Sequence, residues 1–369
     1  MILVWILLAI ALPVVAVMLG RRGLQGVVAG RRRLPGEHAI DELTTWQIGG
    51  VPQAVQLRGN DARNPLLLYL HGGPGMPAMP FAHAFQRDWE DQLTVVHWDQ
   101  RNAGKTLALN GTEPGLDLAC YVTDGLEIAR SLAARFPGQP IALLGQSWGS
   151  AIAVEMLRAA PDLFAGYMAI GQVSDFLCAE RYGYETVLAE AQRRGDERSI
   201  ATLTAHADYP ANGSLTKASL GAVRGAEMKL GFGHHTKPNI MLKMLGTAFA
   251  SPDYRWRDLL TFFNGHAQAV SVDIALAELP RFIGRARGAR IACPVVMVGG
   301  EYDLFTPTRM AREFFDTIEA PYKKFVEVPG MAHFGVNEKP AVIRRALFET
   351  LLPAVNRHVL AEGGHPSHQ

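Results

Sequence analysis

Short apolar runs recur along the chain and predict the strands of a buried β-sheet. Each run is continuously apolar rather than alternating, which is typical of a parallel sheet covered on both faces. Amphipathic stretches between the runs, such as residues 118–135 and 151–160, predict helices. Strands that alternate with helices favour a mostly parallel, doubly wound α/β fold. The predicted strands cover residues 65–70, 93–98, 141–144, 164–170, 291–298 and 324–328.

Residues 172–288 interrupt this alternation of strands and helices. The pattern there is largely helical, as in residues 179–194, and contains no clear series of strands. An insertion of this size between two strands would most simply lie over the strand ends as a cap. We therefore expect an α/β core in two segments, a helical cap between them and a flexible tail. The expected bounds are 46–171 and 289–357 for the core, 172–288 for the cap and 358–369 for the tail.

The first 20 residues carry no charged side chain and predict a transmembrane helix. A helix of about 20 residues is about 30 Å long, which is enough to cross the hydrocarbon of a bilayer. A secretory signal would carry its positive charge before the apolar run and a cleavage site after it. Here the charge follows the run, as Arg21, Arg22, Arg31, Arg32 and Arg33. We therefore favour an uncleaved membrane anchor over residues 1–20, with a cleaved signal or a mis-assigned start codon as alternatives.

The arginines after the apolar run also set the expected orientation of the chain. By the positive-inside rule they stay in the cytoplasm, so the remainder of the chain is expected to face the cytoplasm. Residues 21–45 are rich in arginine and glycine and predict a linker between the anchor and the core.

The composition is that of a folded chain without nucleic-acid or metal partners. The 369 residues are 48% hydrophobic and 19% charged, which is ample for a large core. Lys and Arg number 36 against 35 Asp and Glu, so no field of one sign is expected to attract nucleic acid. The three cysteines are far apart and His234-His235 is an adjacent pair, so neither spacing is typical of a metal site. No dinucleotide or phosphate-loop motif appears either, and we expect no cofactor.

The pentapeptide Gly145-Gln146-Ser147-Trp148-Gly149 follows one predicted strand and opens a predicted helix. This is the G-x-S-x-G pattern of a nucleophile elbow, in which a tight strand-to-helix turn lifts a serine hydroxyl clear of the sheet. Small residues are needed on both sides because the turn leaves no room for a Cβ. The positive end of the following helix favours developing negative charge near the serine. Ser147 is therefore the predicted nucleophile.

A serine nucleophile needs a base within hydrogen-bond reach and a carboxylate that orients the base. On sheets of this type the acid follows the serine in the chain and the histidine comes last. Asp303 and Glu301 lie just after the fifth predicted strand, and His333 lies just after the sixth. The carboxyl ends of parallel strands meet at one edge of the sheet, where ligands bind. We predict His333 as general base and Asp303 as orienting acid, in preference to Glu301, because Asp303 lies deeper in its loop.

The glycine-rich loop His71-Gly72-Gly73-Pro74-Gly75 follows the first predicted strand. Acyl transfer needs N–H donors for the oxyanion, and one of them is the backbone N–H after the nucleophile, here Trp148. The second donor comes from a loop in this position, where glycines let the backbone approach the substrate closely. Pro74 has no N–H, so the donor must be Gly73 or Gly72. We predict an oxyanion hole formed by Gly73 and Trp148.

The block Trp98-Asp99-Gln100-Arg101 ends the second predicted strand. Asp99 and Arg101 are expected to form a structural ion pair behind the site. Together with the loop at 71–75 and the elbow at 145–149, this block resembles the proline iminopeptidase branch of the α/β hydrolases. The resemblance covers roughly residues 48–352 and rests on the three motifs in combination.

The resemblance implies the α/β-hydrolase fold and assigns roles to five residues. Ser147, Asp303 and His333 match the family's catalytic triad, and Gly73 and Trp148 match its oxyanion donors. The cap lacks the Trp-rich W-x-x-W-E segment of true iminopeptidases. We therefore expect the chain to be closer to uncharacterised relatives than to those enzymes.

An aminopeptidase has to bind the ammonium group of its substrate, and a carboxylate in the cap is the natural partner. Glu180 and Glu185 lie on the first predicted cap helix and are the candidates for this role. The alternative is a solvated helix face on which these glutamates lie next to Arg181 and Arg193.

These features lead to three hypotheses about function. The leading one is a membrane-anchored serine hydrolase with an acyl-enzyme mechanism and aminopeptidase activity, similar to proline iminopeptidases, on short peptides or amides. The second is a carboxylesterase on small lipophilic esters, favoured by membrane placement and by the unmatched cap. The third is a non-catalytic binding module, because a fold alone does not determine function. The expected partners are a small-molecule or short-peptide substrate and the membrane, with no nucleic acid.

Overall fold

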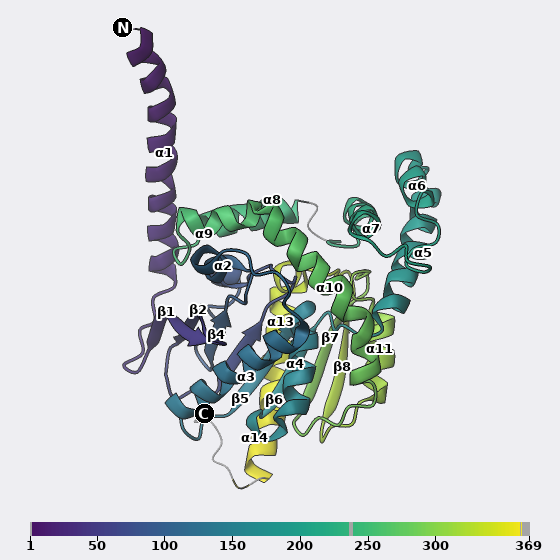
Figure 1. Cartoon of the computed structure of the whole chain (residues 1–369). Coiled ribbons are helices and arrows are strands. Elements are labelled where there is room, and N and C mark those ends of the chain that lie inside the picture. Colours follow the sequence, from purple (N-terminus) through teal and green to yellow (C-terminus); the bar gives the residue numbers. More distant parts are fainter. Residues whose placement is uncertain (1, 236–238, 362, 364–369) are drawn as a thin grey trace.

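The computed structural model describes residues 2–235, 239–361 and 363 of the chain (Figure 1). These residues fold around an eight-stranded sheet in the order β1-β2-β4-β3-β5-β6-β7-β8. β1 pairs with β2 and β2 with β4 in antiparallel fashion, and the other neighbours are parallel. The mostly parallel sheet is confirmed. The strands are β1 (Ile40–Ile48), β2 (Val51–Gly59), β3 (Leu66–Leu70), β4 (Thr94–Trp98), β5 (Ile141–Gln146), β6 (Gly166–Ile170), β7 (Val295–Gly300) and β8 (Lys323–Val328).

Helices cover both faces of the sheet, which explains why its central strand β3 is apolar at every position. Leu66, Leu68 and Leu70 of β3 pack in one core cluster with side chains of α3, α4 and α11. Leu67 and Tyr69 pack in a second cluster with side chains of η4 and α14. Successive side chains of a strand point to opposite faces, so a strand covered on both faces is apolar at every position. The core helices are η1 (Met79–Ala84), α2 (Gly104–Asn110), α3 (Leu118–Arg135), α4 (Trp148–Ala159), η2 (Pro161–Leu163), α11 (Thr308–Thr317), α12 (Gly335–Glu338), α13 (Pro340–Arg345), η4 (Ala346–Leu351) and α14 (Leu352–Ala361).

The strand prediction misses the antiparallel hairpin of β1 and β2. β1 is an edge strand whose exposure alternates, so it contains no continuous apolar run. The two strands are joined by Gly49 and Gly50, whose φ angles are 56° and 78°. Two consecutive residues with positive φ are typical of the tight turn of a β-hairpin. A glycine pair next to an alternating run is the signal that identifies this hairpin.

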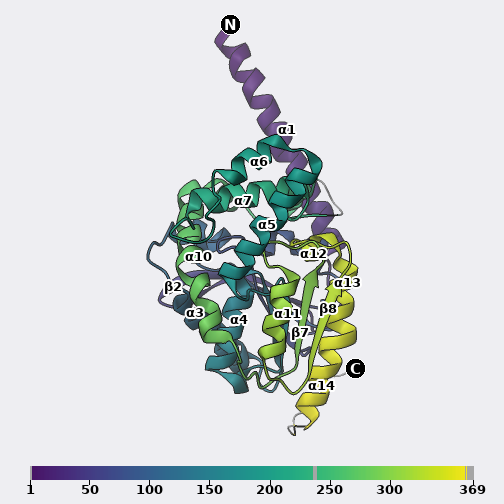
Figure 2. The same cartoon turned by 90° about the vertical axis from the view of Figure 1, so that its right-hand side faces the viewer.

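The described residues between β6 and β7 form helices and connecting turns, without a strand. In Figure 2, α5, α6 and α7 lie at the end of the molecule from which α1 projects. α10 returns to the core, where Ile274 and Phe282 pack in the same cluster as β3. These helices are α5 (Phe176–Arg194), α6 (Glu197–Thr204), α7 (Lys217–Leu230), α8 (Ile240–Ala250), α9 (Trp256–Leu260), η3 (Thr261–Phe263) and α10 (Gly265–Ala286).

The first helix is longer than predicted. α1 spans Ile2–Arg31, so residues 21–31 of the predicted linker over 21–45 are helical. Residues 40–45 of the same predicted linker belong to β1. The reason is that Arg21 and Gln25 donate side-chain hydrogen bonds to carbonyl oxygens between β6 and β7, which holds this part of α1 against the body of the molecule. By length and composition Ala11–Arg31 can cross a membrane, a property that an N-terminal signal sequence shares.

The predicted flexible tail over 358–369 begins too early. α14 continues to Ala361, and Val359 packs against the second core cluster. Of this prediction, residues 362 and 364–369 lie outside the described part of the chain.

Candidate active site

Ser147 occupies a tight turn between β5 and α4. Its backbone angles are φ 50° and ψ −121°, a conformation that residues with a side chain rarely adopt. The flanking glycines are required sterically. A Cβ on Gly149 would lie 2.0 Å from the carbonyl oxygen of Leu70, and one on Gly145 would lie 2.7 Å from the Cα of Ser150. These contacts explain the G-x-S-x-G pattern.

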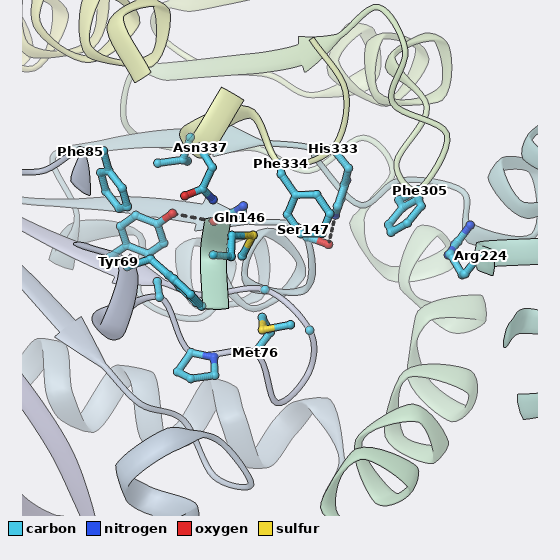
Figure 3. A pocket seen from close by; sticks show the side chains of 17 residues that line it. Tyr69, Met76, Phe85, Gln146, Ser147, Arg224, Phe305, His333, Phe334 and Asn337 are labelled. Atoms are coloured by element: carbon cyan, nitrogen blue, oxygen red, sulfur yellow. Dashed lines mark hydrogen bonds between the residues drawn. The ribbon is translucent and has the colours of Figure 1, made fainter. Parts of the chain in front are cut away.

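His333 faces the hydroxyl of Ser147 (Figure 3). His333 Nε2 lies 3.1 Å from Ser147 Oγ, and His333 Nδ1 lies 3.1 and 3.0 Å from Asp303 Oδ1 and Oδ2. An ionised carboxylate beside Nδ1 makes that nitrogen the proton-bearing one, which leaves the lone pair of Nε2 directed at the serine. The fold therefore brings together the three side chains that the sequence placed after β5, β7 and β8.

Asp303 is held in place by three hydrogen bonds from its own loop. The backbone N–H groups of Phe305 and Thr306 donate to Oδ1, each at 2.9 Å, and Thr306 Oγ1 donates to Oδ2 at 2.9 Å. The rival carboxylate Glu301 is exposed and accepts from the N–H of Gly330 at 2.9 Å. Of these two carboxylates, Asp303 is the one that contacts the imidazole.

The predicted oxyanion donors lie next to the serine. A Cβ on Gly72 would be only 3.3 Å from the Cβ of Ser147, so the loop at 71–75 runs close to it. Gly73 and Trp148 both line a cavity that Ser147 also lines. The two segments that carry the predicted oxyanion donors therefore border the same cavity as Ser147.

A buried histidine supports this loop from behind. His71 Nε2 accepts the backbone N–H of Gln100 at 3.1 Å, and its Nδ1 lies 2.8 Å from the carbonyl oxygen of Gly72. Burial lowers the pKa of His71 to about 4, so at neutral pH the ring is uncharged and Nδ1–H donates to Gly72. Gln100 Oε1 also accepts from Trp148 Nε1 at 3.2 Å. Gln100 thus links the two segments that carry the predicted oxyanion donors.

Two cavities adjoin Ser147. The larger has a volume of about 290 Å³ and the smaller about 120 Å³, and Gly73, Ser147, Arg224 and Phe305 line both. In Figure 3, Tyr69 and Gln146 lie on the opposite side of Ser147 from Arg224 and Phe305. The larger cavity has an apolar wall made by Met76, Pro77, Ala78, Phe81, Phe85, Met244, Phe334 and Val336.

A buried charge cluster lies at the Arg224 end of the cavities. Arg224 of α7 donates to Glu180 and, at 2.7 Å, to Glu227, and the hydroxyl of Tyr209 also donates to Glu180. The guanidinium lies 4.6 Å from the ring centroid of Phe305. Burial raises the pKa of Glu227 to about 8, against the attraction of Arg224. Within the described residues, no group of three or more His, Cys, Asp or Glu side chains is placed to hold a metal ion.

The structure separates the two glutamates proposed to bind a substrate ammonium. Glu180 is buried, and its oxygens accept from Arg224 and Tyr209, so Arg224 rather than Glu180 lines the cavities. Glu185 is exposed and pairs with Arg181, one helical turn away, at 2.6 Å. Glu185 therefore lies on an exposed helix face beside Arg181, as the alternative describes. Sequence reasoning misses Arg224, because an arginine in an amphipathic helix is normally read as a surface residue.

The ion pair expected between Asp99 and Arg101 does not form. Arg101 pairs with Asp124 at 2.6 Å and with Glu113 at 2.7 Å. Asp99 instead accepts from the hydroxyl of Tyr254, and burial raises the pKa of Asp99 to about 7. The two side chains leave the turn in different directions, one toward α3 and one toward the segment before α9.

Comparison with known proteins gives consistent results across sequence and structure. A family model described as alpha/beta hydrolase fold matches residues 65–340. The chain is 28% identical over 319 residues to "Probable aminopeptidase YbaC" of Bacillus subtilis, which covers 85% of this chain and 97% of that protein. It is 25% identical over 310 residues to a proline iminopeptidase of Levilactobacillus brevis, which covers 79% and 90%. The solved structure of a proline iminopeptidase-related protein from Thermus thermophilus matches with a TM-score of 0.56 at 20% identity, covering 86% of this chain and 99% of that one.

Proposed function

Because this chain belongs to the alpha/beta hydrolase fold family, we propose that it is a serine hydrolase whose nucleophile is Ser147. The family and the aminopeptidase-named relatives make it a hydrolase enzyme and confirm its resemblance to the proline iminopeptidase branch, which disfavours a non-catalytic binding module. The observation that carries the finer proposal is the hydrogen-bonded chain from Ser147 Oγ through His333 to Asp303. In this proposal residues 46–171 and 289–357 carry the catalytic groups, and residues 172–288 form the cap that bounds the substrate cavity.

The proposed reaction proceeds through an acyl-enzyme. Ser147 Oγ attacks the substrate carbonyl carbon while His333 Nε2 accepts the hydroxyl proton, and Asp303 stabilises the resulting imidazolium. The N–H groups of Gly73 and Trp148 stabilise the negative charge on the tetrahedral oxygen. The proton on Nε2 passes to the leaving amine or alcohol as its bond to carbon breaks. A water molecule, deprotonated by His333, then attacks the acyl carbon. His333 returns this proton to Ser147 Oγ as the bond between Oγ and the acyl carbon breaks, which releases the acid and restores the serine.

The proposed substrates are short peptides or amides with a free amino end. The two aminopeptidase-named relatives support this class. The charge cluster adds no direct partner for the ammonium, because the guanidinium of Arg224 lines the cavities and Glu180 and Glu227 do not. Both carboxylates pair with Arg224. In this proposal Glu180 therefore positions Arg224 and does not contact the substrate.

A carboxylesterase for small lipophilic esters is the second candidate function. The specific observation in its favour is the apolar wall of the larger cavity, to which Met76, Phe81, Phe85, Met244 and Phe334 contribute. An acyl or alkyl group would gain free energy by leaving water for such a wall. Ester substrates need no ammonium partner, so this reading makes no demand on the charge cluster.

Two measurements on the full-length chain in detergent test these assignments. A fluorophosphonate probe should label the chain, and Ser147→Ala should abolish the labelling, whereas Ser131→Ala at an exposed position of α3 should leave it unchanged. A panel of aminoacyl arylamides and p-nitrophenyl esters then separates the two functions. Release of arylamine supports the aminopeptidase, and hydrolysis of esters alone selects the carboxylesterase. Equal labelling of Ser147→Ala and the unmodified chain would remove the serine mechanism.

The remaining part of the proposal concerns placement in the cell. We propose that the uncharged residues 1–20 anchor the enzyme in a membrane with the catalytic part in the cytoplasm, supported by the apolar character of α1 and by the arginines that follow at positions 21 and 22. Reporter fusions after Ala361 test the orientation. A fluorescent GFP fusion with an inactive alkaline phosphatase fusion is the expected pair of results, and the opposite pair would reverse the orientation.

A further inference from the structure

Three short helices between β6 and β7 expose a set of large apolar side chains. Leu242 is 71% exposed, Leu260 65% and Phe263 72%, and three neighbours on the same helices are also exposed. We call this set the α8–η3 face, and it consists of Met241, Leu242, Leu245, Trp256, Leu260 and Phe263. Exposed apolar groups gathered on consecutive helices are typical of an interaction surface.

α8 carries apolar side chains on both its inner and its outer side, and its one charged residue is the exposed Lys243. Its inner residues Ile240, Met244 and Ala248 are buried in a core cluster with Met79 and Phe81. Its outer side carries part of the α8–η3 face, so the helix is not amphipathic in the manner of an ordinary surface helix. Large exposed apolar side chains on a helix whose inner side is already buried are typical of a surface that contacts a partner or a membrane.

The α8–η3 face lies beside the apolar helix α1. In Figure 1, α8 and α9 lie next to α1 at the level where that helix leaves the body of the molecule. α1 itself exposes apolar side chains from Leu12 to Leu24, including Val17 and Leu19. The apolar surface of the anchor and the apolar surface of the cap are therefore neighbours.

Specific contacts fasten α1 to the helices that carry this face. Arg21 is buried, and its guanidinium donates to the carbonyl oxygens of Phe249 at 2.9 Å and Tyr254 at 2.6 Å. The same guanidinium lies 4.7 Å from the ring centroid of Trp256, a member of the α8–η3 face. Gln25 donates to the backbone between α8 and α9 as well.

A salt bridge at the lower end of α1 completes this attachment. Arg32 Nη1 lies 2.6 Å from Asp253 Oδ2, and both side chains are nearly buried. Contacts at Arg21, Gln25 and Arg32 span three turns of helix, so α1 and the α8–η3 face form one surface rather than two flexibly linked parts. A bilayer crossed by the uncharged part of α1, which ends at Gly20, would therefore border this face.

We propose that the α8–η3 face is a membrane-contact surface that lies in the lipid interface next to α1. The occupant is the bilayer because the face is continuous with the helix proposed to cross it. Its aromatic members Trp256 and Phe263 are of the type that concentrates at the membrane interface. The proposal uses the anchor of the proposed function but depends neither on the catalytic residues nor on the substrate.

One consequence concerns the cavity at Ser147. Met244 lies on the inner side of α8 and lines the larger cavity, while Leu242 and Leu245 lie on its outer side. α8 therefore separates the proposed lipid surface from the cavity by the thickness of a single helix.

Quenching by brominated lipid tests the proposal on the full-length chain. The half-buried Cys120 and the exposed Cys178 are first replaced, as Cys120→Ser and Cys178→Ser, and buried Cys293 is kept. Single cysteines are then introduced as Leu242→Cys or Phe263→Cys and labelled with NBD. The matched control is Leu360→Cys on α14, an exposed leucine (55%) at the other end of the molecule (Figure 1). Leu12→Cys in α1 (65% exposed) reports insertion of the anchor.

The labelled chains are reconstituted in phosphatidylcholine nanodiscs with and without dibrominated acyl chains. A face buried about 5–10 Å in the headgroup and acyl boundary should lose about half of its NBD fluorescence to the bromines. The label at position 360 should keep its fluorescence. Melting temperatures of the labelled chains show whether each variant is folded.

Each outcome decides the proposal. Quenching at positions 242 and 263 but not at 360 supports the membrane contact, whether or not position 12 is quenched. If position 12 is quenched but positions 242 and 263 lose no more fluorescence than position 360, the membrane contact is overturned and the anchor stands. No quenching at 12, 242 or 263 overturns both. If neither aqueous iodide nor brominated lipid quenches the labels at positions 242 and 263, the membrane contact is overturned. That result would indicate that a second copy of the chain covers this face.

Discussion

Replacing Asp303 with asparagine tests the proposed hydrogen-bond chain most directly. Asp303→Asn preserves the size of the side chain, and the amide oxygen can still accept from the N–H groups of Phe305 and Thr306. The amide NH₂ then faces His333 Nδ1, where Asp303 now lies at 3.0 Å. Nδ1 has to accept a hydrogen bond instead of donating one, so the proton moves to Nε2. Nε2–H points at Ser147 Oγ and cannot take up the hydroxyl proton.

The expected loss is large because the imidazole has little freedom to adapt. His333 and Asp303 are 7% and 3% exposed, so water has little access to replace the lost interaction. A wrong tautomer with intact geometry reduces turnover by about ten-thousand-fold, which corresponds to about 5.4 kcal/mol of activation free energy. The fold should persist, since the loop hydrogen bonds to the amide oxygen remain.

The assay is the second-order rate of fluorophosphonate labelling, together with kcat for whichever substrate of the panel is cleaved. Glu301→Gln is the matched control, because Glu301 lies in the same loop but is exposed and away from the imidazole. It should retain the activity of the unmodified chain. Residual activity of Asp303→Asn above about a tenth would refute the tautomer argument. An equal loss in Glu301→Gln would identify the wrong carboxylate.

Three further predictions concern the elbow, the charge cluster and the anchor. Gly149→Ala should abolish labelling or folding, because the new Cβ would lie 2.0 Å from the carbonyl oxygen of Leu70. The control is Gly284→Ala in α10, where a Cβ meets open space. This control should raise the free energy of unfolding by about 0.5–1 kcal/mol in a chemical denaturation series. Burial raises the pKa of Glu227 from 4.5 to about 8, so the folded chain holds a proton that the unfolded chain releases, and stability falls as the pH rises through this range. Glu227→Gln should therefore flatten the decline in melting temperature between about pH 5 and about pH 8, and an unchanged slope would contradict the raised pKa. Arg21→Ala removes the charged donor of two carbonyl oxygens, those of Phe249 and Tyr254. It should lower the free energy of unfolding, measured in detergent, by about 1.5–3 kcal/mol. The control Arg22→Ala, at an exposed position, should change this free energy little.

The geometry of the proposed site is predictable because its residues lie at the ends of recognisable strands. Ser147 is bounded by glycines that the turn requires, Asp303 follows the buried apolar strand β7, and His333 follows the edge strand β8. A parallel sheet brings such strand ends to one edge whatever the details of packing. The choice of Asp303 over Glu301 was made from loop position, and it agrees with the contacts to His333.

Predictions that depended on side-chain partners fared worse. Glu185 and Glu180 share a helix, but Glu185 points to solvent whereas Glu180 is buried against Arg224 of another helix. Asp99 and Arg101 are near neighbours in the chain, and each bonds to a different distant segment. The pairing of long polar side chains depends on which segments pack together, and local sequence does not contain that information.

By itself the sequence determined the strands of the parallel core and the groups at its carboxyl edge, because contiguous apolar runs and glycine-bounded turns encode them locally. Only the tertiary structure decided that Arg224 faces the cavities, that α1 continues beyond its apolar segment, and that Arg21 fastens it to residues more than 200 positions away. The physical reason is that a buried charge is stable only with its partners in place, and those partners meet only when the chain has folded.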